Sequence, residues 1–246
     1  MKKNSMIRTF KELIKESLCD RLNIPYSSSG LPISLVKHLK KGQPINLVDV
    51  GSYNGDFTDA LAGYCGISRG LLIDPLPHKA ASLRQRFHPP TYQVFECALS
   101  SKNGSIEFEV NETEVTSSIL SIRKEMPELG DISLGVSKTI KCDTRTLDDI
   151  AKEANIDAID LLKIDVQGAE HLVLMGAKEV LNKTSMIWSE VSFKALYEAS
   201  STFMDIYDML LPAGFKLIEI EPGFRGPDGE MIQGDALFIN TRKRSI

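Results

Sequence analysis

Short apolar runs alternate with segments of helical spacing along most of the chain. The runs have the length and β-branched content of strands, and they cover residues 45–50, 70–73, 91–95, 158–164 and 185–191. Helices are predicted between and after them, over residues 56–61, 78–87, 168–182 and 203–211. Short helices are also predicted at 31–40 and at 146–150, the second with Thr146 as its cap and Asp149 as the acid three residues later. Strands that alternate with helices predict a mainly parallel sheet with helices on both of its faces.

Two further strands are predicted near the end of the chain, at 215–220 and 236–240, with no helical segment between them. A connection without a crossover helix makes neighbouring strands antiparallel. Alternating apolar positions predict another strand at 105–110, and residues 138–142 are also strand-like. The predicted fold class is therefore α/β, with a mostly parallel sheet and an antiparallel last strand.

Residues 1–44 form a predicted helical extension, and residues 45–246 form the predicted main domain. Within the extension, the segment 6–18 carries its apolar residues on one face of a helix. We expect this helix to pack against the domain, and a role as a lid or at a membrane surface is the alternative.

Composition and charge limit the classes of partner. The formal net charge of −4 argues against a protein that binds nucleic acid through a basic surface. The four cysteines are scattered without a C-x-x-C pair, as is typical of reduced thiols. Residues 1–20 lack the apolar core of a signal peptide, and no run is long enough to cross a bilayer. The sequence predicts a cytoplasmic protein without stable membrane insertion, and it gives no indication of oligomeric state.

A glycine turn follows the strand at 45–50. Gly51 and Gly55 bracket this turn, and a helix starts at Asp56, with Asn54 or Asp56 as its predicted cap. A strand, a glycine turn and a helix start are typical of the first half of a nucleotide site. The dinucleotide fingerprint has a middle glycine that lets a pyrophosphate approach, and this chain lacks it. The turn therefore favours a nucleoside ligand without a phosphate, such as S-adenosylmethionine.

Asp74 ends the second strand, where a carboxylate can accept hydrogen bonds from both ribose hydroxyls. Ala98 and Leu99 follow the third strand and are expected to form an apolar wall for the adenine. An ordinary strand-end role for Asp49 and Asp74 is the alternative interpretation. The predicted cofactor-binding residues are Asp49, Gly51, Ser52, Tyr53, Asn54, Gly55, Thr58, Asp74, Pro75, Ala98, Leu99 and Asp165.

A second signature, DLLKIDVQGAE at 160–170, places charged residues at the carboxyl end of another strand, where open α/β sheets bind ligands. With it, the sequence resembles the FkbM family of S-adenosylmethionine-dependent methyltransferases. The matching segments are VDVGSYNGDFT at 48–58, LLIDPLP at 71–77, ALSSKNGSIEFEV at 98–110, TRTLDDI at 144–150, LLKIDVQGAEHLVLMGA at 161–177, and the closing AGFKLIEI and DALFIN. The chain departs from the family inside the glycine turn, where Tyr53 and Asn54 replace smaller residues.

The resemblance implies a Rossmann-like class I methyltransferase fold with a seven-stranded sheet. It also implies methyl transfer, usually to a hydroxyl oxygen, because many relatives act on sugars, polyketides or other secondary metabolites. The expected partner is thus a small-molecule or carbohydrate acceptor. The sequence does not separate an oxygen acceptor from a nitrogen one.

Three carboxylates are the predicted catalytic residues: Asp165, Glu170 and Glu190. Such oxygen ligands suit a divalent cation, so Mg²⁺ is a further predicted cofactor, with Asp165 and Glu190 as its ligands. Glu170 alternatively stabilises only the start of its own helix. Gln167 is a candidate for orienting substrate, and His171 is an alternative base.

Two other functions compete with methyl transfer. An NAD-type oxidoreductase is disfavoured by the missing middle glycine and by the lack of an evident Ser/Tyr/Lys or Cys/His set. A non-catalytic nucleotide-binding module would not need the carboxylates of the second signature. The acceptor is expected to contact the segments 111–135 and 221–234, and loops of this kind carry specificity without a transferable code.

Overall fold

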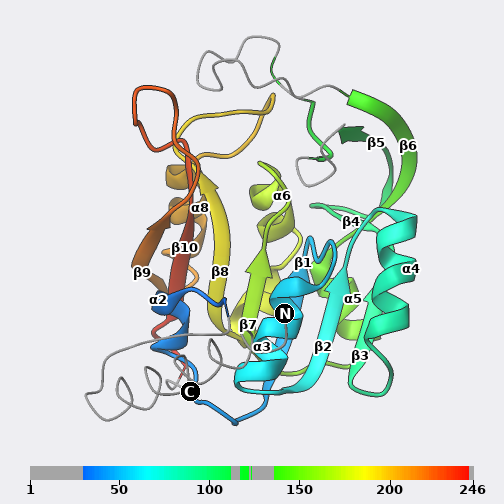
Figure 1. The fold of residues 1–246 in the computed structure, drawn as a ribbon, viewed down its shortest axis with the longest axis vertical. Coiled ribbons are helices and arrows are strands. Elements are labelled where there is room, and N and C mark those ends of the chain that lie inside the picture. The colour runs from blue at the N-terminus through cyan, green and yellow to red at the C-terminus, as the bar shows by residue number, and fades with distance from the viewer. Residues whose placement is uncertain (1–29, 112–116, 122, 124–135, 244–246) are drawn as a thin grey trace, which may run out of the picture.

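The computed structural model describes residues 30–111, 117–121, 123 and 136–243. The predicted helix at 6–18 and most of the segment 111–135 lie outside these residues. A seven-stranded sheet runs through the centre of the molecule, in the order β3-β2-β1-β7-β8-β10-β9 (Figure 1). The strands are β1 (Ile45–Val50), β2 (Ile67–Ile73), β3 (Tyr92–Phe95), β7 (Ile159–Ile164), β8 (Thr184–Ser192), β9 (Phe215–Pro222) and β10 (Gln233–Asn240).

Most neighbours in this sheet are parallel. The strands β3, β2, β1, β7 and β8 pair in parallel, whereas β10 is antiparallel to both β8 and β9. The prediction of a mostly parallel seven-stranded sheet with an antiparallel last strand is confirmed. Because β10 runs against β8, its first residues lie beside the carboxyl end of β8.

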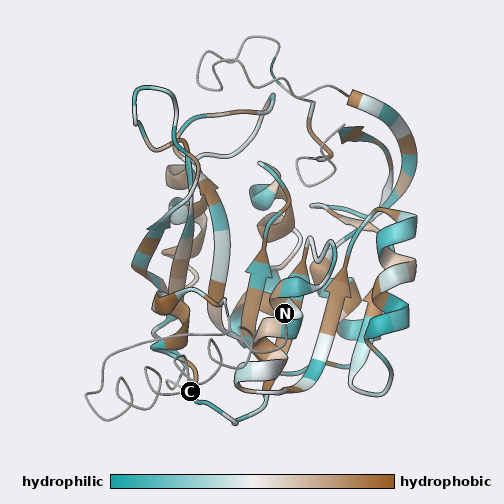
Figure 2. Cartoon of the chain, viewed as in Figure 1, coloured by the Kyte–Doolittle hydropathy of each residue, from teal (hydrophilic) through white to brown (hydrophobic). Residues whose placement is uncertain are grey.

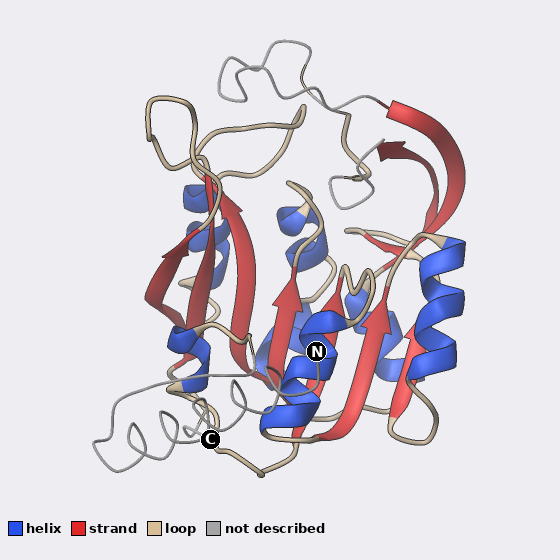
Figure 3. Ribbon diagram, viewed as in Figure 1, coloured by secondary structure: helices blue, strands red, loops and turns tan. Residues whose placement is uncertain are grey.

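Helices cover both faces of the sheet, as predicted (Figure 3). On one face, α2 (Ile33–Val36) and α3 (Asp56–Tyr64) pack through Leu35 and Leu61 against strand residues that include Trp188. The other face is covered by α5 (Leu147–Glu153), α6 (Glu170–Met175), α7 (Lys178–Lys183) and α8 (Phe203–Leu210). The helix α4 (Pro77–Arg86) packs against Leu72 near the β3 edge. Hydrophobic residues concentrate along the central strands, which the helices bury (Figure 2).

A second sheet has three strands, β4 (Ala98–Leu99), β5 (Gly104–Asn111) and β6 (Val136–Arg145), in the order β4-β6-β5. The strands predicted at 105–110 and 138–142 are therefore present, but they pair with each other outside the main sheet. They extend past the carboxyl ends of the main strands (Figure 1). Phe108 of β5 packs against Leu76 and Ala98, which fixes this sheet beside the β2 end.

Three local predictions were wrong. The helix predicted at 168–182 is broken into α6 and α7. The Gly176 carbonyl accepts from the Asp148 amide at 3.0 Å, and the Asp148 carboxylate accepts from the Glu179 and Val180 amides at the start of α7. The cap of α3 is Gly55, in a left-handed conformation, and neither Asn54 nor Asp56 caps it. Of the helix predicted at 31–40, only Ile33–Val36 is helical.

The cap predicted for α5 is confirmed, since the Thr146 hydroxyl accepts a hydrogen bond from the Asp149 amide at 3.2 Å. Within the described part of the chain, no helix has the length and apolar character that crossing a membrane requires.

Candidate active site

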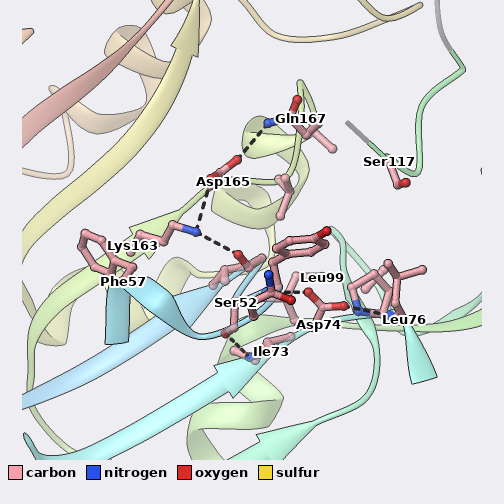
Figure 4. A pocket seen from close by; sticks show the side chains of 18 of the residues that line it. Ser52, Phe57, Ile73, Asp74, Leu76, Leu99, Ser117, Lys163, Asp165 and Gln167 are labelled. Atoms are coloured by element: carbon pink, nitrogen blue, oxygen red, sulfur yellow. Dashed lines mark hydrogen bonds and ion pairs between the residues drawn. The ribbon is translucent and has the colours of Figure 1, made fainter. Parts of the chain in front are cut away.

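A cavity of about 400 Å³ opens at the carboxyl ends of β1, β2 and β7 and reaches the start of β10. This is the edge at which open α/β sheets bind ligands. Figure 4 shows the cavity with side chains from the glycine turn, the β2 end and the β7 end facing one another. Of the predicted site residues, those that line it are Gly51, Ser52, Tyr53, Asn54, Asp74, Pro75, Ala98, Leu99 and Asp165.

The glycine turn connects three strands. Gly51 has φ +74°, and a Cβ there would lie 1.9 Å from the Asp165 carbonyl oxygen. Only glycine permits both this conformation and this approach of β1 to β7. The Ser52 hydroxyl donates to the Asp49 carbonyl at 2.7 Å and accepts from the Ile73 amide at 3.1 Å. The Ser52 hydroxyl thus joins β1 to β2 and serves the turn itself.

The Asp74 carboxylate is held by two backbone amides. Its Oδ2 accepts from the Tyr53 N–H at 2.8 Å, and its Oδ1 accepts from the Leu76 N–H at 2.9 Å (Figure 4). Asp74 is only 4% exposed, and burial raises its pKa. Each carboxylate oxygen has two lone pairs, so both can accept a further hydrogen bond from a ligand in the cavity.

Asp49 and Thr58 lie behind the cavity. Asp49 is fully buried, and its Oδ2 accepts from the Thr58 hydroxyl at 2.7 Å. Its Oδ1 lies 3.4 Å from the Lys163 ammonium, which also lies 3.3 Å from Asp165 and donates to the Gly51 carbonyl at 2.8 Å. The two carboxylates raise the pKa of Lys163, so this buried side chain is charged.

The prediction of direct ligand contact therefore does not fit Asp49 and Thr58, because neither lines the cavity. Gly55 does not line it either, since it faces Leu83 of α4 and Phe87, which follows that helix. These three residues support the turn from behind. The alternative interpretation of Asp49 as a structural carboxylate at a strand end agrees with its contacts.

An amide connects two of the predicted catalytic carboxylates. Nε2 of Gln167 donates to Asp165 Oδ1 at 2.9 Å and to Glu190 Oε2 at 3.0 Å. Glu190 Oε2 also accepts from Gln233 Nε2 at 3.1 Å. Burial, followed by the nearby Asp165, raises the pKa of Glu190 well above its ordinary value. Glu190 does not line the cavity, whereas Asp165 and Gln167 do.

This arrangement does not fit the predicted Mg²⁺ site. The nitrogen of Gln167 lies between the two carboxylates that were predicted to bind the ion, and an amide nitrogen is a donor, not a metal ligand. Nor do the described residues include a group of three or more His, Cys, Asp or Glu side chains placed to hold a metal ion.

Glu170 has a structural position. Its Oε1 accepts from the amides of Val166 and Gly168, both at 3.1 Å, and the side chain is 2% exposed. Burial raises its pKa to about 7. Glu170 lies outside the cavity lining and so does not fit the predicted catalytic role, and His171 does not line the cavity either. Glu170 holds the loop between β7 and α6.

Sequence reasoning missed the far end of the cavity, which is lined by Pro32, Phe57, Trp188 and Asp235. Asp235 pairs with Glu190 across β10 and β8. Burial, followed by Asp165, raises the pKa of Asp235 to about 6. A signal was present in the sequence: an acid begins an otherwise apolar strand, and the start of an antiparallel strand lies at the carboxyl ends of its parallel neighbours.

The comparisons with known proteins agree with this geometry. Residues 49–217 match the model of the methyltransferase FkbM domain. The 2-O-methyltransferase NoeI of Sinorhizobium fredii is 30% identical over 98% of this chain and 97% of its own length.

Among solved structures, the methyltransferase FkbM of Methylobacillus flagellatus KT has the same fold, with a TM-score of 0.52 and 17% identity. The match covers 82% of this chain but only 44% of that chain. The domain match and the similarity to NoeI together show that the chain belongs to the FkbM family of methyltransferases.

Proposed function

We propose that this S-adenosylmethionine-dependent methyltransferase methylates a hydroxyl oxygen on a sugar, a glycan precursor or a secondary metabolite. The observation that carries the proposal is the similarity over nearly the whole chain to a protein named as a 2-O-methyltransferase. The family membership supports methyl transfer over the oxidoreductase and binding-module alternatives.

The residues around the glycine turn fit S-adenosylmethionine. The buried Asp74 offers free lone pairs to two ribose hydroxyls, because its backbone partners use only one position on each oxygen. Ala98 and Leu99 are buried apolar residues beside it, suited to a flat adenine ring. The proposed cofactor contacts are these residues with the turn residues 51–54, Pro75 and Asp165.

The bound cofactor supplies a methyl group on a sulfonium, which is already activated for displacement. The protein's task is to align the acceptor oxygen and to take up its proton. Asp165 is the proposed base, because it lines the cavity and is oriented on both sides, by Lys163 at 3.3 Å and by Gln167 at 2.9 Å. General-base assistance of this kind contributes about 10²- to 10⁴-fold to a rate.

The first test is calorimetric titration with S-adenosylmethionine and, separately, with NAD. We expect S-adenosylmethionine to bind. Asp74→Ala should lower the affinity for it at least about tenfold, because the lost hydrogen bonds involve a charged acceptor. Asp157→Asn is the matched control, since Asp157 is an exposed acid paired with Lys183 far from the cavity lining.

Methyl transfer itself is followed with a labelled methyl group and a panel of sugar, phenol and amine acceptors. Label recovered on a hydroxyl oxygen would support the proposal, and Asp165→Asn should then lower kcat by a larger factor than it weakens the binding of S-adenosylmethionine, because Asp165 is proposed both as the base and as one of several cofactor contacts. Label recovered only on nitrogen, or binding of NAD alone, would contradict it.

A further inference from the structure

The far end of the cavity differs chemically from the end at the glycine turn. It lies between the Gly30–Pro32 segment, the first turn of α3 and the strands β8 and β10. Pro32 and the aromatic residues Phe57 and Trp188 line it, and Asp235 is its acid. Apolar rings beside a carboxylate form an amphipathic surface, which suits a ligand with one apolar face and several hydroxyls.

The strand register places these groups on one face of the sheet. Lys163 of β7 lies opposite Trp188 of β8, and Glu190, two residues along β8, lies opposite Asp235 of β10. Alternate residues of a strand point to the same face, so Trp188 and Asp235 face the cavity from neighbouring strands. Asp165 follows Lys163 by the same spacing, and Gln167 joins it to Glu190, the cross-strand neighbour of Asp235. Asp165 and Asp235 thus line the same cavity from nearby strands.

Acids outnumber cations along the described lining of the cavity, which includes Asp56, Asp74, Asp165 and Asp235. Among the described residues that line the cavity, Lys163 is the sole cation, and its ammonium is already shared by Asp49, Asp165 and the Gly51 carbonyl. A phosphate or a carboxylate on the acceptor would thus meet Asp165 and Asp235, and the described lining offers it no further cation. A hydroxyl, by contrast, can donate to either carboxylate.

We propose that the cavity end formed by Pro32, Phe57, Trp188 and Asp235 is the acceptor subsite, and that it takes a sugar ring that carries no phosphate or carboxylate. This inference rests on the proposed function and narrows it. The apolar face of the ring packs on Phe57 and Trp188, and Asp235 accepts a hydrogen bond from a ring hydroxyl. Another hydroxyl then lies toward Asp165. Asp235 is thus a specificity-determining residue.

The chain provides a direct probe of this end, because Trp188 is its only tryptophan. Tryptophan emission therefore reports on the subsite without methyl transfer. The full chain, saturated with S-adenosylhomocysteine, would be titrated with the methyl glycosides of glucose, galactose and mannose. The matched anionic ligands are the corresponding sugar 1-phosphates, the uridine diphosphate sugars and methyl glucuronide.

We expect at least one neutral glycoside to change the emission in a saturable way, with an affinity at least about tenfold above that of its anionic counterpart. Asp235→Ala should weaken the glycoside about tenfold or more, through loss of a charged acceptor. Asp235→Asn removes the charge and keeps the side-chain size. It should therefore reduce the ratio between the affinity for the neutral glycoside and the affinity for the sugar 1-phosphate. Asp157→Asn should change neither value.

The outcomes separate this inference from the proposed function. Binding of S-adenosylmethionine that depends on Asp74, with methylation of hydroxyl acceptors but no emission response to any glycoside, would overturn the subsite and leave methyl transfer standing. An equal or stronger response to the phosphates would also overturn it. Glycoside binding without binding of S-adenosylmethionine would instead contradict the proposed function.

Discussion

The two ends of the cavity hold their carboxylates in different ways. At the β2 end, Asp74 is fixed by the backbone amides of Tyr53 and Leu76. At the β7–β8 end, the side-chain amide of Gln167 holds Asp165, which lines the cavity, and Glu190, which lies outside the lining. Gln233 donates a second hydrogen bond to Glu190. The first arrangement depends on the course of the chain, whereas the second depends on particular side chains.

This difference separates what each end can tolerate. A backbone amide persists through most substitutions. The position of the Asp74 carboxylate should therefore change only when the turn that carries these amides is distorted. At the other end, burial and then the nearby Asp165 raise the pKa values of Glu190 and Asp235, and a few side-chain donors stabilise this group of acids. Substitutions at the two ends should therefore change the free energy of unfolding by different amounts, and these changes should depend on pH in different ways.

The largest effect is expected for Gly51→Ala, which breaks the end fixed by the backbone. A Cβ at this position would lie 1.9 Å from the Asp165 carbonyl, and φ is +74°. The strands β1 and β7 would have to separate, so we expect a loss of more than about 4 kcal/mol in the free energy of unfolding. Urea unfolding followed by circular dichroism measures it.

Gly63→Ala is the matched control. Gly63 lies in α3, and a Cβ there would meet nothing within 4 Å. Alanine should raise helix stability by about 0.5–1 kcal/mol at such a site. Similar stabilities for the two variants would show that the close approach of β1 and β7 is not what fixes this end.

Lys163 joins the two ends, since its ammonium contacts both the Gly51 carbonyl and Asp165. In Lys163→Met, the fully buried Asp49 would lose the ammonium that lies 3.4 Å away. It would keep the hydrogen bond from the Thr58 hydroxyl. Removing one member of a buried ion pair costs about 3–5 kcal/mol. We expect a loss of this size in urea unfolding, and Lys163→Met with Asp49→Asn should recover part of it. No recovery in the double variant would contradict the pairing.

The same division explains what the sequence could predict. The turn residues 51–54 and Asp74 are local features of a strand–turn–helix pattern, and they line the cavity at the strand ends where the sequence placed a ligand site. The order of strands and helices likewise gave the seven-stranded sheet. Asp49 and Thr58 were also predicted as ligand contacts, but they lie outside the cavity lining, because strand position alone does not say which side chain turns toward a buried lysine.

The β7–β8 end depends on contacts between distant segments. Gln167 connects Asp165 to Glu190, and Asp235 arrives from a strand 70 residues after Asp165. No local pattern predicts that an amide occupies the space between two acids, so a metal site was the natural but unsupported expectation. The break between α6 and α7 has the same origin, since Asp148 from a distant segment bonds to the Gly176 carbonyl before it and to the Glu179 and Val180 amides after it.

A smaller effect is expected for Gln167→Met, which removes the amide and keeps the side-chain length. Asp165 and Glu190 would then face each other without their shared donor, at a cost of about 1–3 kcal/mol in unfolding free energy at pH 8. The loss should shrink at pH 5, because Glu190 protonates more readily without this hydrogen bond. Gln233→Met is the control, since Gln233 donates to Glu190 and Ser192 but not to Asp165. An equal loss in both variants would contradict the bridging role.

The smallest effect expected is the change of stability with pH that Asp235 contributes. Burial raises the pKa of Asp235 to about 6 from an ordinary value of 3.8. Between these two pH values the folded protein holds a proton on Asp235 that the unfolded chain has released. The stabilising contribution of Asp235 to the free energy of unfolding is therefore fully present below about pH 4, and it is lost as the pH rises through about 6. Because Asp235 is only partly buried, its contribution to the free energy of unfolding should change by about 1 kcal/mol between pH 4 and pH 7.

Glu170, with a pKa of about 7, also lowers the free energy of unfolding as the pH rises, and this decline should remain in Asp235→Asn. Thermal unfolding across this range should show a shallower decline for Asp235→Asn than for the natural chain or Asp157→Asn. An unchanged decline would mean that Asp235 titrates normally and that the acids at this end of the cavity are better solvated than their burial indicates.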